Sequence, residues 1–192
     1  MFPPVVGALI LLGSLGIAGL GLLALLRGTL RRDARLRRVG WLVALGAVGG
    51  YGILWLVGLF GSPHRALAIG EEVRFCGLDC HLHVSVVRSE RGNDLGVMVR
   101  FRSDAKRAEE YPGLLRLEVV DSDGRRYAPS DGQIAEPLEA GATIEREFRF
   151  TVPAEARAPA LVVSYAGWLD YLLPGAGNPL AQRRLRLTLD RA

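Results

Sequence analysis

The sequence predicts a two-helix transmembrane hairpin followed by an all-β antiparallel sandwich, immunoglobulin-like and of about seven strands. Three observations predict this fold class: two long uncharged apolar runs near the N-terminus, a cluster of arginines between them, and alternating apolar residues through the rest of the chain. The chain divides near Gly61. Six arginines and one aspartate precede this residue, whereas eighteen basic and nineteen acidic residues follow it. Because the excess positive charge lies outside the folded domain, the composition argues against a nucleic-acid partner.

The two apolar runs are long enough to cross a bilayer. Residues 5–26 form a run of 22 residues without charge, and residues 41–60 form a run of 20. At a rise of about 1.5 Å per residue, these runs span about 33 Å and about 30 Å, against a hydrocarbon core of about 30 Å. Trp41 lies at one end of the second run, and Trp55 and Phe60 lie toward the other. Aromatic rings at these positions favour the membrane–water interfaces.

The charge of the connecting segment predicts the orientation of the hairpin. Residues 27–40 carry six arginines, which are Arg27, Arg31, Arg32, Arg35, Arg37 and Arg38. Short cytoplasmic loops carry an excess of Lys and Arg, so this segment is expected in the cytoplasm and both chain ends outside it. The protein is then a multi-pass protein of the cytoplasmic (inner) membrane, with residues 66–192 as an extracytoplasmic domain. A cleaved signal peptide is the alternative, but no Lys or Arg precedes the first run and its length exceeds the usual apolar region.

Each apolar run contains a pair of small residues four positions apart. Gly46 and Gly50 form this pair in the second run, and Ser14 and Ala18 form it in the first. Such spacing places small residues on one helix face and lets two backbones approach closely. We expect these faces to pack the two helices against each other, with a homodimer contact as the alternative.

Seven runs of alternating apolar residues predict seven strands, each with one buried and one wet face. The runs are residues 73–75, 82–86, 97–101, 115–119, 148–152, 161–165 and 185–189. Turn residues separate several of them, at residues 92–94, 121–124 and 153–155. Short strands with turn signals and no amphipathic helix between them favour an antiparallel sandwich, and a domain of this size buries a core without added staples.

Part of this domain resembles a known group of proteins. The segments 138–141, 147–156 and 161–164 are similar to the late strands of membrane-anchored immunoglobulin-like domains of unknown function found in many bacteria. In those domains a turn ending in Gly precedes a strand that ends in F-x-V-P-A, which is residues 150–154 here. Residues 74–81 also resemble the opening strands of such proteins. The resemblance covers residues 70–189, excludes the hairpin, and implies an extracytoplasmic β-sandwich without supplying catalytic residues.

One segment has chemical potential, Cys76-Gly77-Leu78-Asp79-Cys80-His81, followed by His83. In an oxidising compartment two nearby thiols form a disulfide by default, so we expect a Cys76–Cys80 bridge and no cofactor. The C-x-x-x-C-H spacing also resembles a lengthened haem-attachment sequence with His81 as the axial ligand. His81 and His83 share one strand face. With both thiolates they are candidate ligands for copper or zinc. An exchangeable, regulatory disulfide is the fourth interpretation.

The connection between the last two predicted strands is unusually apolar. It contains Trp168, Tyr171, Leu172 and Leu173, which are candidates for an exposed partner-binding patch or for contact with the lipid surface. Most apolar loop residues fold back onto their own core. We therefore favour a plug over the open end of the sandwich.

The sequence contains no recognisable catalytic set, since a G-x-S-x-G motif and a supporting acid–base pair are both missing. We therefore expect a non-enzymatic, membrane-tethered module for interaction or envelope sensing, with the lipid bilayer and an envelope protein as partners. The alternative is a redox, metal or haem-handling protein that uses the cysteines and histidines of residues 76–83. A third hypothesis is a subunit of a larger membrane complex. The sequence leaves the oligomeric state open.

Overall fold

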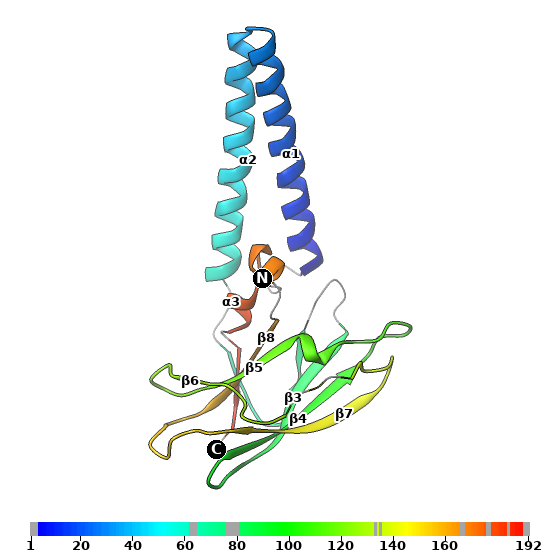
Figure 1. Ribbon diagram of the computed structural model, residues 1–192, viewed down its shortest axis with the longest axis vertical. Helices are drawn as coiled ribbons and strands as arrows, with labels where there is room; N and C mark the ends of the chain where they lie inside the picture. Colours follow the sequence, from blue (N-terminus) through cyan, green and yellow to red (C-terminus); the bar gives the residue numbers. More distant parts are fainter. Residues whose placement is uncertain are drawn as a thin grey trace.

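The computed structural model of the protein describes residues 4–61, 65–75, 81–132, 134, 136–165, 168–175, 178–183 and 185–189. Two long antiparallel helices, α1 (Pro4–Leu30) and α2 (Ala34–Phe60), form a hairpin, and a two-sheet β-sandwich lies at the open end of this hairpin (Figure 1). The coarse prediction of two long apolar helices followed by a β-sandwich is confirmed.

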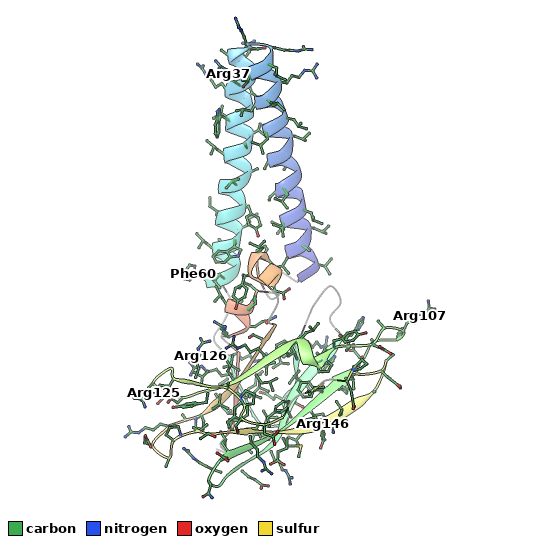
Figure 2. The ribbon with its side chains drawn as sticks, viewed as in Figure 1. Arg37, Phe60, Arg107, Arg125, Arg126 and Arg146 are labelled. Carbon is green, nitrogen blue, oxygen red and sulfur yellow. The ribbon has the colours of Figure 1, made fainter. Side chains whose placement is uncertain are left out.

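The hairpin turn is much shorter than the predicted arginine-rich loop 27–40. Only residues 31–33 connect the two helices. Asp33 caps α2, because its Oδ1 accepts hydrogen bonds from the backbone N–H groups of Arg35 (2.9 Å) and Leu36 (3.1 Å). Arginine is a good helix former, so the helices continue through the charged segment and the uncharged run marks only their middle. The arginines lie exposed at this turn, at the end of the hairpin away from the sandwich (Figure 2).

Both helices are long and apolar enough to cross a membrane, judged by length and composition. Their large apolar side chains are mostly exposed, as shown by Leu20 and Leu42, which are each 66% exposed. A core helix of a soluble domain buries such side chains, so these two helices are not part of the sandwich core.

The helices make their closest contact at glycines near the turn. A Cβ atom on Gly21 would lie 2.7 Å from the backbone nitrogen of Ala44, and a Cβ atom on Gly40 would lie 2.6 Å from the backbone nitrogen of Leu25. Neither position has room for a side chain. Glycine is therefore what allows the two backbones to approach this closely.

Gly46 and Gly50 do not take part in this contact. Both are exposed, and a Cβ atom on either residue would meet no atom within 4 Å. The prediction that this pair packs the two helices together is wrong for the second run, where Gly40 and Ala44 occupy the packed face instead. A glycine-rich helix presents the same four-residue spacing on several faces, and spacing alone does not select one of them.

The sandwich consists of two sheets. Sheet A has the order β1-β9-β8-β5-β6, and sheet B has the order β2-β3-β4-β7. The strands of sheet A are β1 (Arg65–Leu67), β9 (Leu185–Thr188), β8 (Ala160–Tyr165), β5 (Leu115–Val120) and β6 (Arg126–Tyr127). The strands of sheet B are β2 (Val73–Phe75), β3 (Leu82–Arg91), β4 (Leu95–Ser103) and β7 (Thr143–Phe150). Three short helical segments lie in the connections, which are η1 (Pro112–Leu114), η2 (Trp168–Leu172) and α3 (Pro179–Gln182).

Each of the seven predicted runs overlaps a strand, although the run 148–152 meets β7 only at residues 148–150, and the described residues contain two further short strands, β1 and β6. The sandwich is not wholly antiparallel as predicted, because β1 pairs with β9 in parallel, with Arg65 opposite Leu185. The other described strand pairs are antiparallel. Alternation is weak in a strand of two or three residues, and among these strands only β2 showed it, with Val73 and Phe75 on either side of Arg74. The pairing direction of such a strand depends on how the chain crosses between the sheets.

The core lies between the two sheets. Every second residue of β4 from Leu95 to Ser103 is buried, which is the alternation that predicted this strand. Phe101 and Phe150 are fully buried, and the rings of Phe101 and Phe148 meet edge to face at 6.2 Å. Each such ring contributes about 1.5–3 kcal/mol through its burial. This core holds the strand ends on which the candidate sites are built.

Candidate functional site

Two histidines and one aspartate meet where β3 and β4 pair. The hairpin places Leu82 opposite Ser103 and thereby brings Asp104, just after β4, beside the residue that precedes β3. The Asp104 backbone N–H donates to the His81 carbonyl oxygen at 2.9 Å. The Asp104 carboxylate lies 2.7 Å from His81 Nδ1 and 2.8 Å from His83 Nε2. The structure therefore brings both predicted histidines onto one carboxylate.

A second carboxylate faces His83 from the other side. Glu72, which precedes β2, lies with Oε2 3.2 Å from His83 Nδ1, an ion-pair distance without hydrogen-bond alignment. The Arg102 guanidinium donates to both Glu72 oxygens, at 3.2 Å from Nε and 2.6 Å from Nη2. The His83 side chain is only 3% exposed. We name Glu72, His81, His83, Arg102 and Asp104 the histidine–carboxylate cluster.

The charges of this cluster shift the pKa values of its acids downward. Hydrogen bonds from His83 and then His81 lower the pKa of the Asp104 carboxyl below its ordinary value. The hydrogen bond from Arg102 is the main cause that lowers the pKa of Glu72, and Glu72 in turn raises the pKa of Arg102. Both carboxylates are therefore ionised at neutral pH. With each ring nitrogen of the buried His83 facing a carboxylate, this imidazole is closed to an external substrate.

His81 is placed differently from His83. Its side chain is 40% exposed, and its Nδ1 is bound by Asp104. Metal-binding histidines commonly hold a carboxylate in this way through one nitrogen and present the other. The structure describes no group of three or more His, Cys, Asp or Glu side chains able to hold a metal ion. Cys76 and Cys80 lie outside the described residues, so the disulfide, haem, copper and zinc interpretations stay predictions.

Sequence reasoning did not find Glu72, Arg102 or Asp104 as members of this cluster. Asp104 is 23 residues from His81, and Arg102 is 30 residues from Glu72. The available signal was the charge of Arg102, which alternates with the buried positions of β4. Charge alternation is common on any solvated strand face, so it does not select partners without the pairing register.

The apolar segment between β8 and β9 lies against the helices. In Figure 1, η2 is drawn in orange between the ends of α1 and α2 nearest to the sandwich. Trp55 Nε1 of α2 donates a hydrogen bond to the Tyr171 carbonyl oxygen at 3.0 Å, and the Tyr51 hydroxyl donates to the Leu172 carbonyl oxygen. The Asn178 side-chain amide donates to the carbonyl oxygens of Tyr171 and Leu173, both at 2.9 Å.

Two glycines of the helices admit this segment. A Cβ atom on Gly7 of α1 would lie 2.7 Å from the Pro174 carbonyl oxygen, and one on Gly58 of α2 would lie 2.6 Å from the Gly175 nitrogen. Farther along, α3 contacts β8 and also α2. Residues 171–175 and 178–182 thus connect the hairpin with sheet A, and we name residues 171–175 the docking segment.

This placement differs from the plug that the sequence favoured. Backbone carbonyls of Tyr171 and Leu172 are engaged with α2, and the Leu172 side chain is 42% exposed. Leu173 is half-buried, and the side chain of Trp168 lies outside the described part of the structure. Apolar residues of a loop do fold back, but here the surface they meet is the helical hairpin. Binding of a separate partner by these residues stays a prediction.

No family model matches the sequence, and no curated protein matches it. Among solved structures, the chain is similar to the secreted protein MPT63 from Mycobacterium tuberculosis, with 12% identity, a TM-score of 0.41, and coverage of 56% of this chain and 92% of that one. It is also similar to an uncharacterized β-sandwich protein from Clostridium difficile 630, with 12% identity, a TM-score of 0.43, and coverage of 67% and 96%.

Proposed function

We propose that the protein is a non-enzymatic, membrane-tethered module that presents an immunoglobulin-like sandwich on the extracytoplasmic side of the bacterial inner membrane for interaction or envelope sensing. The observation that carries this proposal is the arrangement of the hairpin. Its arginine-rich turn lies at one end and the sandwich at the other, and the docking segment fixes the sandwich on the helices. Soluble domains rarely expose apolar surfaces as large as those of these two helices.

The arginines support the orientation. All six lie within or beside the turn, and short cytoplasmic connections are rich in Lys and Arg. With the turn in the cytoplasm, a pair of spans places the sandwich on the opposite side. Trp55 and Phe60 then lie toward the extracytoplasmic end of α2, where aromatic residues favour the interface.

The strand order supports the immunoglobulin-like assignment. The neighbours β9-β8-β5-β6 follow the order G-F-C-C′ of the variable-type sheet, and β3-β4-β7 follow the order A-B-E of the opposite sheet. Strand D has no counterpart among the described strands, and β1 and β2 are additional edge strands. Immunoglobulin-like sandwiches carry many unrelated functions on their loops and edges, so this assignment by itself names no ligand.

Reporter fusions test the proposed topology. Alkaline phosphatase, which requires an oxidising compartment, is expected to be active when fused after Ala192 and inactive when inserted after Arg32. Green fluorescent protein is expected to give the opposite pattern. A chain of the full 20.8 kDa in the membrane fraction excludes removal of the first helix. Fluorescence from the fusion after Ala192 would refute the extracytoplasmic placement.

Redox or metal handling is the second candidate function. One specific observation favours it: His81 is partly exposed, and its Nδ1 is held by Asp104 just after the Cys76–Cys80 sequence. Intact mass with and without reductant, haem staining and metal analysis of the purified chain separate the cases. A mass lower by two hydrogens without metal or haem supports a plain disulfide, whereas bound metal that is lost in Cys76→Ser supports the second function.

A further inference from the structure

Strand β5 has one incompletely paired side. Its six residues, Leu115–Val120, all pair with β8, but on the opposite side β6 pairs only with Val119 and Val120. Among the described residues, no strand pairs with residues 115–118 on that side. Sheet A therefore ends in a short open edge beside β6.

Pro129 explains why β6 stops after two residues. Tyr127 pairs with Val119, so a continued strand would place residue 129 opposite Leu117. Proline has no backbone N–H to donate there and is unfavourable in a paired strand. The chain instead crosses to sheet B, where the Ser130 N–H donates to the Arg149 carbonyl oxygen at 2.7 Å and the Arg149 N–H donates to Asp131 at 3.2 Å.

The backbone of β5 directs hydrogen-bonding groups into the space that β6 leaves open. The Asp121 N–H donates to the Arg125 carbonyl oxygen at 3.1 Å, on the β6 side of the sheet. Donors and acceptors of alternate residues in a strand point to the same side. Val119 and Leu117 therefore point their N–H and C=O groups toward β6, and no described residue pairs with Leu117 there.

An apolar cavity lies at this open edge. Its volume is about 400 Å³, and its walls include Leu115 and Leu117 of β5, Phe148 of β7, and Ala128 and Pro129 of the crossing segment. A cavity of this size falls within the range of about 300–1,000 Å³ that is typical of ligand sites. Gly132 of the crossing segment also lines the cavity, and we name this space the β5 slot.

A second cavity adjoins the slot. It has a volume of about 300 Å³ and shares Gly113 and Ile134 with the first. Tyr111 and Leu114 line it and are 55% and 60% exposed, which makes them, with Leu172, the most exposed large apolar side chains of the described sandwich part. Exposed apolar residues that gather beside a cavity are typical of a binding surface.

We propose that the β5 slot binds an extended peptide segment of a partner protein, which adds to sheet A as a short strand beside Leu117 and inserts an apolar side chain into the cavity. The Leu115 N–H does not take part, because it donates to the Pro112 carbonyl oxygen. Strand addition gives affinity through main-chain hydrogen bonds and specificity through pockets for alternate side chains. A lipid chain offers no partner for the Leu117 N–H and C=O groups. The edge of a second sandwich would have to pass Ala128, Pro129 and Gly132 of the crossing segment, which line the same cavity.

This inference rests on the proposed function as an interaction module, because it names the chemical class of the partner. The test uses the full chain in lipid nanodiscs and a phage-displayed library of random twelve-residue peptides, with empty nanodiscs for counter-selection. Enriched peptides are expected to carry alternating apolar residues, and their synthetic versions are expected to bind the chain in solution. If no peptide is enriched above the empty nanodiscs, the proposal is overturned.

Two matched variants locate the binding. Ala128→Trp places a large side chain at the exposed rim of the slot, and Ala140→Trp places the same side chain at an exposed turn elsewhere. The first is expected to weaken peptide binding at least about tenfold and the second to leave it unchanged. Equal binding by both variants would overturn the slot as the site. Circular dichroism of both variants confirms that the sandwich is folded.

Methylated peptides distinguish strand addition from simple burial of a side chain. Methylation of peptide N–H groups at alternate positions is expected to abolish binding in one register, where these groups face β5, and to leave it unchanged in the other. Equal loss or equal retention in both registers would refute strand addition. Because the chain is held in nanodiscs, this result does not depend on topology. A cytoplasmic sandwich in the reporter assay would refute the proposed function and leave the slot measurement intact.

Discussion

Removal of the two hydrogen bonds between α2 and the docking segment is expected to loosen this segment without unfolding the sandwich. The double variant Tyr51→Phe and Trp55→Phe keeps an aromatic ring at both positions while it removes the hydroxyl and the indole N–H that bind the carbonyl oxygens of Tyr171 and Leu172. Other bonds from Asn178 to the segment remain.

The magnitude follows from these two bonds. A hydrogen bond in water contributes about 1 kcal/mol net, whereas interhelical bonds measured in a membrane average about 0.6 kcal/mol. The local opening free energy should therefore fall by about 1.2–2 kcal/mol, which raises the open population about 8- to 30-fold. The hydrogen bond of Trp55 is half-buried and that of Tyr51 is more exposed. We therefore expect Trp55→Phe alone to cause the larger part of the fall in the opening free energy.

Hydrogen exchange measured by mass spectrometry in nanodiscs tests this prediction. The amide of Leu173, which donates to the Asp170 carbonyl oxygen at 3.1 Å, reports opening of the segment. Amides of β3 and β4 report global unfolding. Trp41→Phe is the matched control, because Trp41 is 54% exposed at the other end of α2. Unchanged exchange at Leu173, or an equal change in β4, would show that these bonds do not hold the segment.

Three further predictions concern the hairpin, a turn and the histidine–carboxylate cluster. Gly40→Leu is expected to destabilise the hairpin in detergent by about 1–3 kcal/mol, because a Cβ atom at this position would clash with the backbone of α1. The control Gly46→Leu places its side chain in open space and should leave the stability unchanged. Equal melting temperatures of the two variants would contradict the packing described. Asp121→Ala should lower the melting temperature, because this buried carboxylate accepts hydrogen bonds from two backbone N–H groups and from a tyrosine hydroxyl of its turn. The control Asp123→Ala changes an exposed residue and should leave the melting temperature unchanged. Similar melting curves of the two variants would refute this role of Asp121. The pKa of Asp104 is lower in the folded protein than in the unfolded chain, so its stabilisation is present above about pH 3.9 and is lost as the pH falls through the folded value. Urea unfolding of the wild type and of Asp104→Asn should therefore differ at pH 7, and this difference should shrink as the pH falls below about 3.9 towards the folded pKa. A difference that shrinks already between pH 7 and pH 5 would contradict the direction of this shift.

The parts of the fold that depend on local pattern could be predicted from the sequence. Alternation with a period of two is a property of neighbouring residues, and it marked every described strand except β1 and β6. It also placed Phe101 and Phe150 on the faces of their strands that point to the core. The two long helices could also be predicted, because an uncharged apolar run of about 20 residues is typical of a membrane-spanning helix. The ends of the helices could not be predicted in this way, because the helix-forming residues of the charged segment extend both helices beyond the uncharged runs.

The candidate sites depended on pairing, which the sequence does not specify. The histidines were found because they follow a cysteine motif, yet Glu72 and Asp104 reach them only through the register of two hairpins. The open edge of β5 likewise depends on where β6 stops, and Pro129 was readable as a breaker only once its register position opposite Leu117 was known. The spacing of small residues in α2 likewise predicted Gly46 as the packed glycine, whereas Gly40 is the one that contacts α1. The spacing does not specify which face of α2 meets α1.

The long connection between β8 and β9 explains how the hairpin and the sandwich act as one unit. Most connections in compact domains have about 4–6 residues, and a longer one generally has a function of its own. In this connection, residues 171–175 lie against the two long helices, and α3 packs against β8. The sandwich is therefore attached to the hairpin twice, by the chain after α2 and by the docking segment. A single flexible linker would let the sandwich rotate freely over the membrane. Two attachments restrict that rotation, and they therefore hold the open edge of β5 at a fixed side of the hairpin. Under the function that we propose, this edge would meet a peptide of a partner in the same membrane in one orientation.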